Sequence, residues 1–256
     1  PHHPIKTVAH GSLKGITMKT AIFVYDRTGI MAQPWLDKGY RCVLIDGQHE
    51  EGIHPDPDNP MLIRWGLWID AWNESTMVLI NNIEQNFSDI KFIFGFPECR
   101  HLAVSGASHM KRKLDIDIDI QNKALANALL VKNIGSYFDC PWAFENPVSV
   151  ISTMYRKPNF YFHPYEYGGW IEEEDAAHPC YPDYIAPRDA YPKKTGIWCG
   201  NGFKKPSPLP VTPEAGHSRQ HKKLGGRSLK TKNIRSATPR GFALAVGSTM
   251  IDEIEK

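Results

Sequence analysis

The sequence contains no long uninterrupted apolar run. Of its 256 residues, 41% are hydrophobic and 23% are charged, a composition typical of a globular protein with one substantial core. No stretch approaches the ~18 to 20 apolar residues that a membrane span needs, and the N-terminus lacks the basic-then-apolar order of a signal peptide. We therefore expect a cytoplasmic protein with one large domain and no membrane partner.

Cysteine is scarce and unpaired. The five cysteines, Cys42, Cys99, Cys140, Cys180 and Cys199, are spread singly with no C-x-x-C pair. An odd number of separated thiols argues against a disulfide framework and against a zinc ribbon.

Acidic residues are missing from one long segment. The formal net charge is only +2, from 30 basic and 28 acidic side chains, yet no acidic residue occurs between Glu214 and Asp252. Such a basic arm is either a solvated tail or a surface that contacts phosphates. Its basic residues are Arg219, Lys222, Lys223, Arg227, Lys230, Lys232, Arg235 and Arg240.

The first part of the chain alternates between strand and helix patterns. An apolar run at 20–25 predicts a strand, D-R-T-G at 26–29 a turn, and the spacing of the following apolar residues a helix up to Lys38. A second strand at 41–46 ends on Asp46, and 47–60 has the composition of a loop. This order is typical of a doubly wound nucleotide-binding fold.

The alternation continues further along the chain. Helices are predicted at 77–87 and 117–138, and strands at 91–96 and 141–147. These two strands end in the polar triplets P-E-C and E-N-P, at the sheet edge where such folds bind ligands. We therefore predict an α/β, doubly wound, Rossmann-like fold.

A closing helix is predicted near the C-terminus, with Thr238 as its N-cap and Pro239 at its first position. The expected organisation has four parts. These are a flexible leader or tag at 1–17, a catalytic cofactor-binding core at 18–167, inserted loops with the basic arm at 168–235, and the closing helix at 236–256, which packs on the core.

Cys99 and Glu145 are the candidate reactive residues. Cys99 follows a buried strand, and the nearby Arg100 and His101 would favour its thiolate. Glu145 lies at the end of an apolar strand, where partial desolvation would raise its pKa and make it a proton donor. The alternatives are a thiol that serves as a small buried hydrophobe and an ordinary exposed strand-end glutamate.

At these residues the sequence resembles the DNA cytosine-5 methyltransferases. It resembles in particular the short members of the family that phages and prophages encode and that act in a bacterial host cell. The similarity covers most of residues 20–247. The motifs that carry it are YDRTGIMAQPWLDKGYRCVLID, FGFPECRHLAVSGASHMKRK, FENPVSVIS, KPNFYFHPYEYGG, YPKKTGIW and SRQHKKLGGRSLKTKNIRSATPRGFALAV.

The resemblance implies methyl transfer from S-adenosylmethionine to C5 of a flipped-out cytosine in DNA. In the family the cysteine of the proline motif adds to C6 and the glutamate of the E-N motif holds and protonates N3; Cys99 and Glu145 match these positions. Covalent addition divides one difficult step into easier ones, and the base must leave the duplex for a thiol to reach it.

The resemblance also implies a cofactor site after the first two strands. Tyr25 takes the place of the aromatic residue of the F-x-G-x-G motif, Gly29 that of its turn glycine, and Asp46 would accept the ribose hydroxyls. Arg27 and Glu98 depart from the family pattern, and Glu98 would oppose thiolate formation unless it points away or pairs with Arg100. The implied cofactor-binding residues are Tyr25, Asp26, Thr28, Gly29, Asp46 and Pro97.

On the DNA side, Asn146 would position the strand end, and Ser105 would belong to a loop that closes over the base. Arg156 and Lys194 would contact DNA, although a role as ordinary surface charge is equally compatible with their positions. A recognition region for bases has little room outside 168–235. We expect a monomer that binds DNA and no metal.

Two other function classes remain open. A zinc-bound hydrolase or zinc-stapled module could use His178, Cys180, Cys199 and His217, although their spacing fits no compact ligand pattern. A catalytically impaired methyltransferase-like protein could instead bind DNA through the basic arm.

Overall fold

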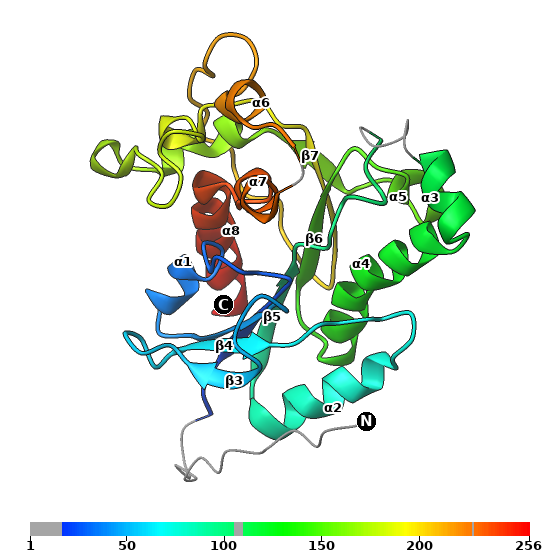
Figure 1. The fold of residues 1–256 in the computed structure, drawn as a ribbon. Helices are drawn as coiled ribbons and strands as arrows, with labels where there is room; N and C mark the ends of the chain where they lie inside the picture. Colours follow the sequence, from blue (N-terminus) through cyan, green and yellow to red (C-terminus); the bar gives the residue numbers. More distant parts are fainter. Residues whose placement is uncertain (1–16, 105–109, 227) are drawn as a thin grey trace.

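An eight-stranded mixed β-sheet forms the centre of the protein (Figure 1). The computed structural model describes residues 17–104, 110–226 and 228–256. The strand order is β3-β4-β2-β1-β5-β6-β8-β7. The strands are β1 (Thr20–Val24), β2 (Arg41–Ile45), β3 (Gly52–Pro55), β4 (Leu62–Gly66), β5 (Ile90–Gly95), β6 (Trp142–Pro147), β7 (Phe160–Phe162) and β8 (Thr195–Gly200).

The middle of the sheet is parallel and its two edges are reversed. Strands β4, β2, β1, β5 and β6 run in one direction. At one edge β3 is antiparallel to β4; at the other, β8 is antiparallel to both β6 and β7. All five residues of β1 are buried, as expected for a parallel strand covered on both faces. The carboxyl ends of the parallel strands therefore meet at one edge, hereafter the carboxyl edge.

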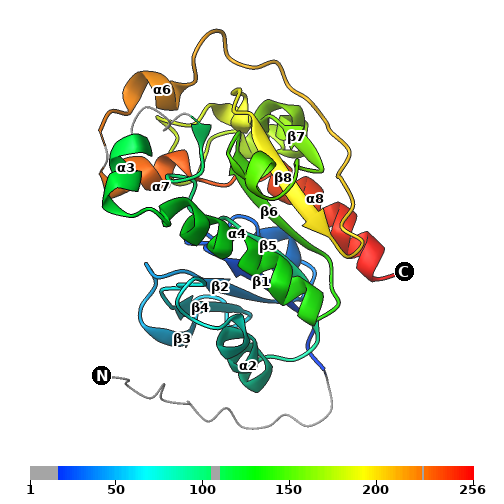
Figure 2. The same cartoon turned by 90° about the vertical axis from the view of Figure 1, so that its right-hand side faces the viewer.

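Helices cover both faces of this sheet (Figures 1 and 2). On one face α1 and α8 pack on Phe23 and Phe94 through Trp35 and Phe242; on the other, α2 and α4 pack on the strands that carry Ile22 and Ile93. The α-helices are α1 (Gln33–Leu36), α2 (Thr76–Asn86), α3 (Met110–Ile116), α4 (Ile120–Tyr137), α5 (Ile151–Met154), α6 (Arg219–Lys223), α7 (Leu229–Arg235) and α8 (Arg240–Ile254).

The chain between β7 and α8 has little regular structure apart from β8. It contains the 3₁₀ turns η2 (Pro164–Trp170), η3 (Glu173–Asp175) and η4 (Pro187–Asp189), followed after β8 by α6 and α7. A small apolar cluster, with Ile185 and Tyr191 from the insertion and Ala237 from the segment before α8, joins these parts. In the described part of the chain, no helix combines the length and apolar character that crossing a membrane requires.

The predicted α/β fold is confirmed, with a mixed sheet at its centre. Most of the predicted elements are also present. The strands at 20–25, 41–46, 91–96 and 141–147 and the helices at 77–87 and 117–138 are present within a few residues. The prediction that 47–60 is all loop is wrong, since it contains β3, and β4 was not predicted. The residues of β3 show no alternation of buried and exposed side chains, because β3 is a short edge strand.

Two helix boundaries also differ from the predictions. The helix after the first strand spans only Gln33–Leu36. The closing helix begins at Arg240 with Pro239 as its N-cap, one residue later than predicted. Proline lacks an N–H, so it fits both the N-cap and the first helical position without losing a hydrogen bond.

Candidate active site

Hydrogen bonds join the two segments that carry Cys99 and Glu145. The Asn146 side chain donates through Nδ2 to the Pro97 carbonyl oxygen at 3.3 Å. Beyond it, the backbone N–H of Val104 donates to Val148 O at 3.1 Å, and that of Val150 donates to Leu102 O at 2.9 Å. The P-E-C segment after β5 and the E-N-P segment of β6 therefore lie side by side at the carboxyl edge.

The Cys99 thiol lies in this joined region. The residue is exposed, and its carbonyl oxygen accepts bonds from the backbone N–H groups of Leu102 and Ala103, which folds the segment into a turn. Although the residue is exposed, neighbouring protein atoms desolvate the thiol and raise its pKa above the ordinary value. Glu145 and Glu98 raise it further, and Lys193 acts in the opposite direction.

The expected activation of the thiol by Arg100 and His101 is therefore wrong. The Arg100 guanidinium pairs with Glu98, with Nε 2.9 Å from Oε1 and Nη2 3.2 Å from Oε2. His101 is held neutral, because burial and the neighbouring Lys113 and Arg100 lower its pKa. Glu98 does pair with Arg100, one of the two arrangements expected to make it compatible with a thiolate. Its charge nevertheless still raises the pKa of the Cys99 thiol.

Glu145 has the environment that the sequence predicted. It is half-buried near the end of β6, and burial raises the pKa of its carboxyl group. Lys193 lowers that pKa again, which places its ammonium within electrostatic reach of the carboxyl. Burial thus favours the protonated form of the carboxyl group, which is the form that a proton donor needs.

The lysine that faces these groups is Lys193 and not Lys194. The register pairs Glu145 with Ile197 and Pro147 with Thr195, so these side chains share one face of the sheet. Lys193 lies two residues before this strand begins, and its charge acts on both Glu145 and the Cys99 thiol. Lys194 takes the opposite face, where its ammonium lies 4.6 Å from the centre of the Tyr161 ring.

The other residues predicted to contact DNA are placed differently. Arg156 donates to Asn159 Oδ1 at 2.7 Å and to the Cys199 carbonyl oxygen at 3.0 Å, so it anchors its own loop to β8. Asn146 is fully buried and positions the strand end through Pro97. Ser105 lies outside the described residues.

A second cluster forms around the loop after β1. Asp26 is 2% exposed, and its Oδ1 accepts bonds from the N–H groups of Thr28 (2.8 Å) and Gly29 (2.9 Å) and from Thr28 Oγ1 (3.1 Å). Gly29 has a φ of +71°, which glycine adopts without strain. The buried Oδ2 of Asp26 has no partner among the described residues, and burial raises the pKa of this carboxyl.

Tyr25 and Asp46 flank this loop. Tyr25 has a φ of 61°, a left-handed conformation that is costly for a non-glycine residue and is often found at functional sites. Its hydroxyl donates to Asn127 O in α4 at 3.1 Å. Asp46 ends the neighbouring strand, accepts a bond from the Gln48 N–H at 2.7 Å, and acts electrostatically on Asp26.

The sequence did not identify two further residues at this edge. Trp68 is 78% exposed, and its ring lies against Gly47, leaving no room there for a side chain. Asp70 acts on the Tyr25 hydroxyl and lines a groove between the β4–α2 loop, α2 and α4. Both residues follow β4, whose sequence has no recognisable strand pattern. The aromatic W-G-L-W run is therefore the one sequence signal that could have identified this region as part of a site.

The basic arm is folded against the insertion. Arg219 pairs with Glu214, with Nη2 2.5 Å from Oε1. Lys223 donates to the Asp183 carbonyl oxygen at 2.8 Å, and Lys230 lies over the Tyr184 ring at 5.7 Å. The arm is therefore not a free tail, although most of its basic side chains are exposed to solvent, as the interpretation as a solvated segment expects. Carbonyl and ring contacts leave the positive charge unneutralised, so the arm still presents cations.

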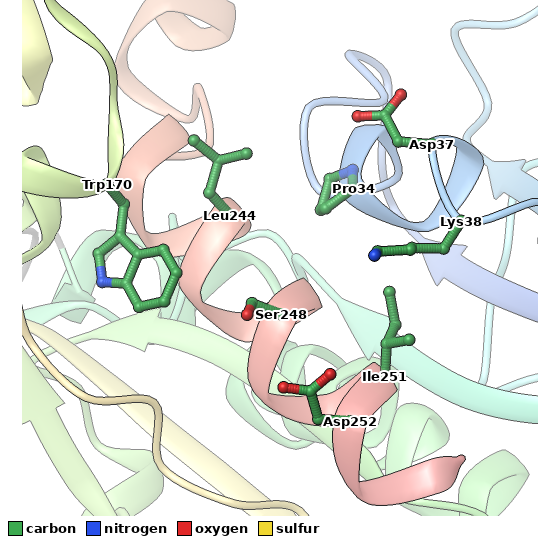
Figure 3. A pocket seen from close by; sticks show the side chains of 8 residues that line it. All are labelled: Pro34, Asp37, Lys38, Trp170, Leu244, Ser248, Ile251 and Asp252. Carbon is green, nitrogen blue, oxygen red and sulfur yellow. The ribbon is translucent and has the colours of Figure 1, made fainter.

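A separate cavity, away from the carboxyl edge, lies on the α1 and α8 face of the sheet (Figure 3). Trp170, Lys38 and Asp252 line it together with apolar side chains, and none of its lining residues belongs to the carboxyl edge. Within the described ranges, no three His, Cys, Asp or Glu side chains are arranged to hold a metal ion. His178, Cys180, Cys199 and His217 therefore do not form the zinc site of the alternative hypothesis.

No protein-family model matches this chain, and no curated protein matches it.

Proposed function

We propose that the protein is a DNA cytosine-5 methyltransferase that uses S-adenosylmethionine. The observation that carries the proposal is the bonding of Asn146 to Pro97, which brings the thiol of Cys99 and the carboxyl of Glu145 to one edge of the sheet. The loop of Asp26 and the acid Asp46 lie at the ends of the neighbouring strands of that edge. The reversed strand β8 beside the last parallel strand agrees with the methyltransferase type of Rossmann-like fold.

The residues of the second cluster fit the proposed cofactor. S-adenosylmethionine carries positive charge on its sulfonium and ammonium groups, and Asp26 has a buried carboxylate oxygen without a partner among the described residues. Asp46 would accept the ribose hydroxyls, and the exposed ring of Trp68 offers an aromatic surface. S-adenosylmethionine, when bound, supplies the electrophilic methyl group.

The residues of the first cluster fit the proposed reaction on cytosine. The Cys99 sulfur, as thiolate, forms a bond to C6 while Glu145 donates its proton to N3, which makes C5 nucleophilic. After C5 has accepted the methyl group, solvent water takes the C5 proton, the C5–C6 double bond re-forms, and the S–C6 bond breaks to return the thiolate. The N3 proton returns to Glu145, which restores both groups. Lys194 and Arg156 have no part in these reaction steps, because Lys194 lies over the Tyr161 ring and Arg156 anchors its own loop to β8.

DNA that contains 5-fluorocytosine tests the proposal. Fluorine replaces the C5 proton, so the enzyme cannot be eliminated and the wild-type protein should form a denaturation-resistant complex in the presence of S-adenosylmethionine. Cys99→Ser should bind the same DNA and form no such complex. A wild-type protein that binds cognate DNA and forms no covalent species would contradict the mechanism.

The raised pKa of the Cys99 thiol and the neighbouring Glu98 favour a second candidate, a catalytically impaired DNA-binding protein. Incubation with DNA and methyl-labelled cofactor separates the two, because this candidate binds DNA and transfers no label. Bisulfite sequencing of DNA from bacterial cells that express the protein would also reveal the target sequence of an active enzyme.

A further inference from the structure

Lys193 is a cation whose charge acts on both groups of the proposed reaction. It lies two residues before Thr195, the first residue of β8, which pairs with Pro147 at the end of β6. Its half-buried side chain donates from Nζ to the carbonyl oxygen of Arg235 at 3.0 Å, at the end of α7. This bond reaches across 42 residues of sequence and ties the ammonium to the basic arm.

We propose that Lys193 is the positioning charge of the active site, which stabilises the Cys99 thiolate. The proposal deepens the function proposed above and rests on it for its catalytic meaning.

The charges around the thiol make such a cation necessary. The described groups that act on it are Lys193 before β8, Glu145 in β6 and Glu98 in its own segment. Two of the three are acids, and the neighbouring Arg100 already pairs with Glu98. Without Lys193, burial and both carboxylates would all favour the protonated thiol, which is a poor nucleophile.

The bond to Arg235 links this charge to the basic arm. An ammonium has three N–H donors, so one can be held by α7 while the others remain available. The same helix reaches the proposed cofactor edge, because Asn233 Nδ2 donates to Gln48 Oε1 at 3.2 Å. The arm therefore contacts both clusters through α7.

The test measures the reactivity of the thiol in the full-length protein without DNA or cofactor. Alkylation of Cys99 by iodoacetamide is followed against pH by mass spectrometry, with the exposed Cys180 of the same molecule as internal reference. Lys193→Met should move the alkylation midpoint of Cys99 upward by about one pH unit. At a fixed pH below the midpoint, the alkylation of Cys99 should then be ~10-fold slower than in the wild type. Lys193→Arg should restore most of the wild-type profile.

Lys194→Met is the matched control, since it removes the same charge from the adjacent position on the opposite face. Its Cys99 profile should equal that of the wild type. Coincident profiles for Lys193→Met and wild type, or equal shifts in Lys193→Met and Lys194→Met, would overturn the proposal. Failure of the fluorocytosine complex with a shifted Lys193→Met profile would instead reject the methyltransferase function and leave the charge effect standing.

Discussion

At the scale of single residues, the environment of the two reactive groups decides how each can act. Glu145 is half-buried, with a raised pKa, and faces one cation, which suits a group that must hold and then donate a proton. The Cys99 thiol is exposed enough for a substrate to reach, yet its pKa is also raised. A thiol of this kind depends on a neighbouring charge for its thiolate, and its reactivity should rise with pH.

Replacement of Glu145 by Gln tests the proton donor. We expect Glu145→Gln to slow methyl transfer by about 100-fold or more, because general acid catalysis contributes on that order, while the affinity for S-adenosylmethionine stays unchanged. Radiolabel transfer and calorimetric titration of the cofactor measure the two quantities.

Glu98→Gln is the matched control for this carboxyl group. Glu98 is exposed and its charge raises the pKa of the Cys99 thiol, so its replacement should not slow methyl transfer. An equal loss of cofactor affinity and transfer in Glu145→Gln would contradict the assigned role.

His178 should make the protein sensitive to mild acid. It is 1% exposed, and its Nδ1 accepts bonds from the backbone N–H groups of Cys180 and Tyr181. Burial and the nearby Arg240 lower its pKa from 6.5 to about 4. Between these values the unfolded chain binds a proton that the folded chain does not. The free energy of unfolding therefore decreases as the pH drops through this range, by at most about 3 kcal/mol.

His178→Asn separates this effect from other titrations. The asparagine Oδ1 can accept the same backbone bonds but does not titrate. Urea denaturation at pH 7.5 and pH 5 should show a smaller loss of stability for His178→Asn than for the wild type. Equal losses in both proteins would exclude His178 as the cause.

At the scale of elements, a carboxylate from the insertion caps the closing helix. Asp189 is buried, and its Oδ2 accepts bonds from the backbone N–H groups of Arg240 (2.5 Å) and Gly241 (3.3 Å). A negative charge at this end also favours the helix dipole. This contact explains why α8 can have Pro239 as its N-cap, although the proline side chain cannot accept a capping hydrogen bond.

Asp189→Ala should lower the free energy of unfolding by about 1 to 2 kcal/mol, the usual value of a helix cap. Asp189→Asn should cost less, because asparagine keeps an acceptor and tolerates the φ of 50° at this position. Urea denaturation of the three proteins measures both. Equal stability of the alanine and asparagine variants would contradict the capping role.

The elements that could be predicted from the sequence are those whose pattern is local. The strand of Ala21 and the helix of Ile134 follow from apolar runs and spacing, because burial on both faces or on one face imposes a period. Strand β3 could not be predicted, since its Gly52 and Pro55 resemble loop residues and its pairing partner supplies the order. Cys99 and Glu145 were identified because Cys99 follows one predicted strand and Glu145 lies near the end of another, whereas Trp68 follows a strand that was not predicted.

At the scale of the whole molecule, the basic arm joins the insertion to the carboxyl edge and carries the charge that we propose for DNA binding. Lys222 and Lys232 are exposed and pair with no acidic side chain among the described residues. The other cations of the arm mostly contact carbonyl oxygens or rings, which leaves their charge available to phosphates.

The salt dependence of DNA binding tests this surface. The double variant Lys222→Gln/Lys232→Gln should bind all DNA sequences more weakly, and the slope of log affinity against log salt should fall by up to about 2. Lys19→Gln/Lys91→Gln removes the same charge where β1 and β5 begin, and should keep the wild-type slope. Unchanged slopes in both variants would exclude the arm as the phosphate contact.

The sequence by itself determined the alternation of buried strands and amphipathic helices, and it placed a thiol and a carboxyl at strand ends, because both depend on residues close along the chain. Only the tertiary structure decided which lysine acts on Glu145 and that the basic arm folds back. Both depend on contacts such as that of Lys193 with Arg235, between residues far apart in sequence. Burial and pairing at such contacts set the charges of the site, and no local pattern encodes them.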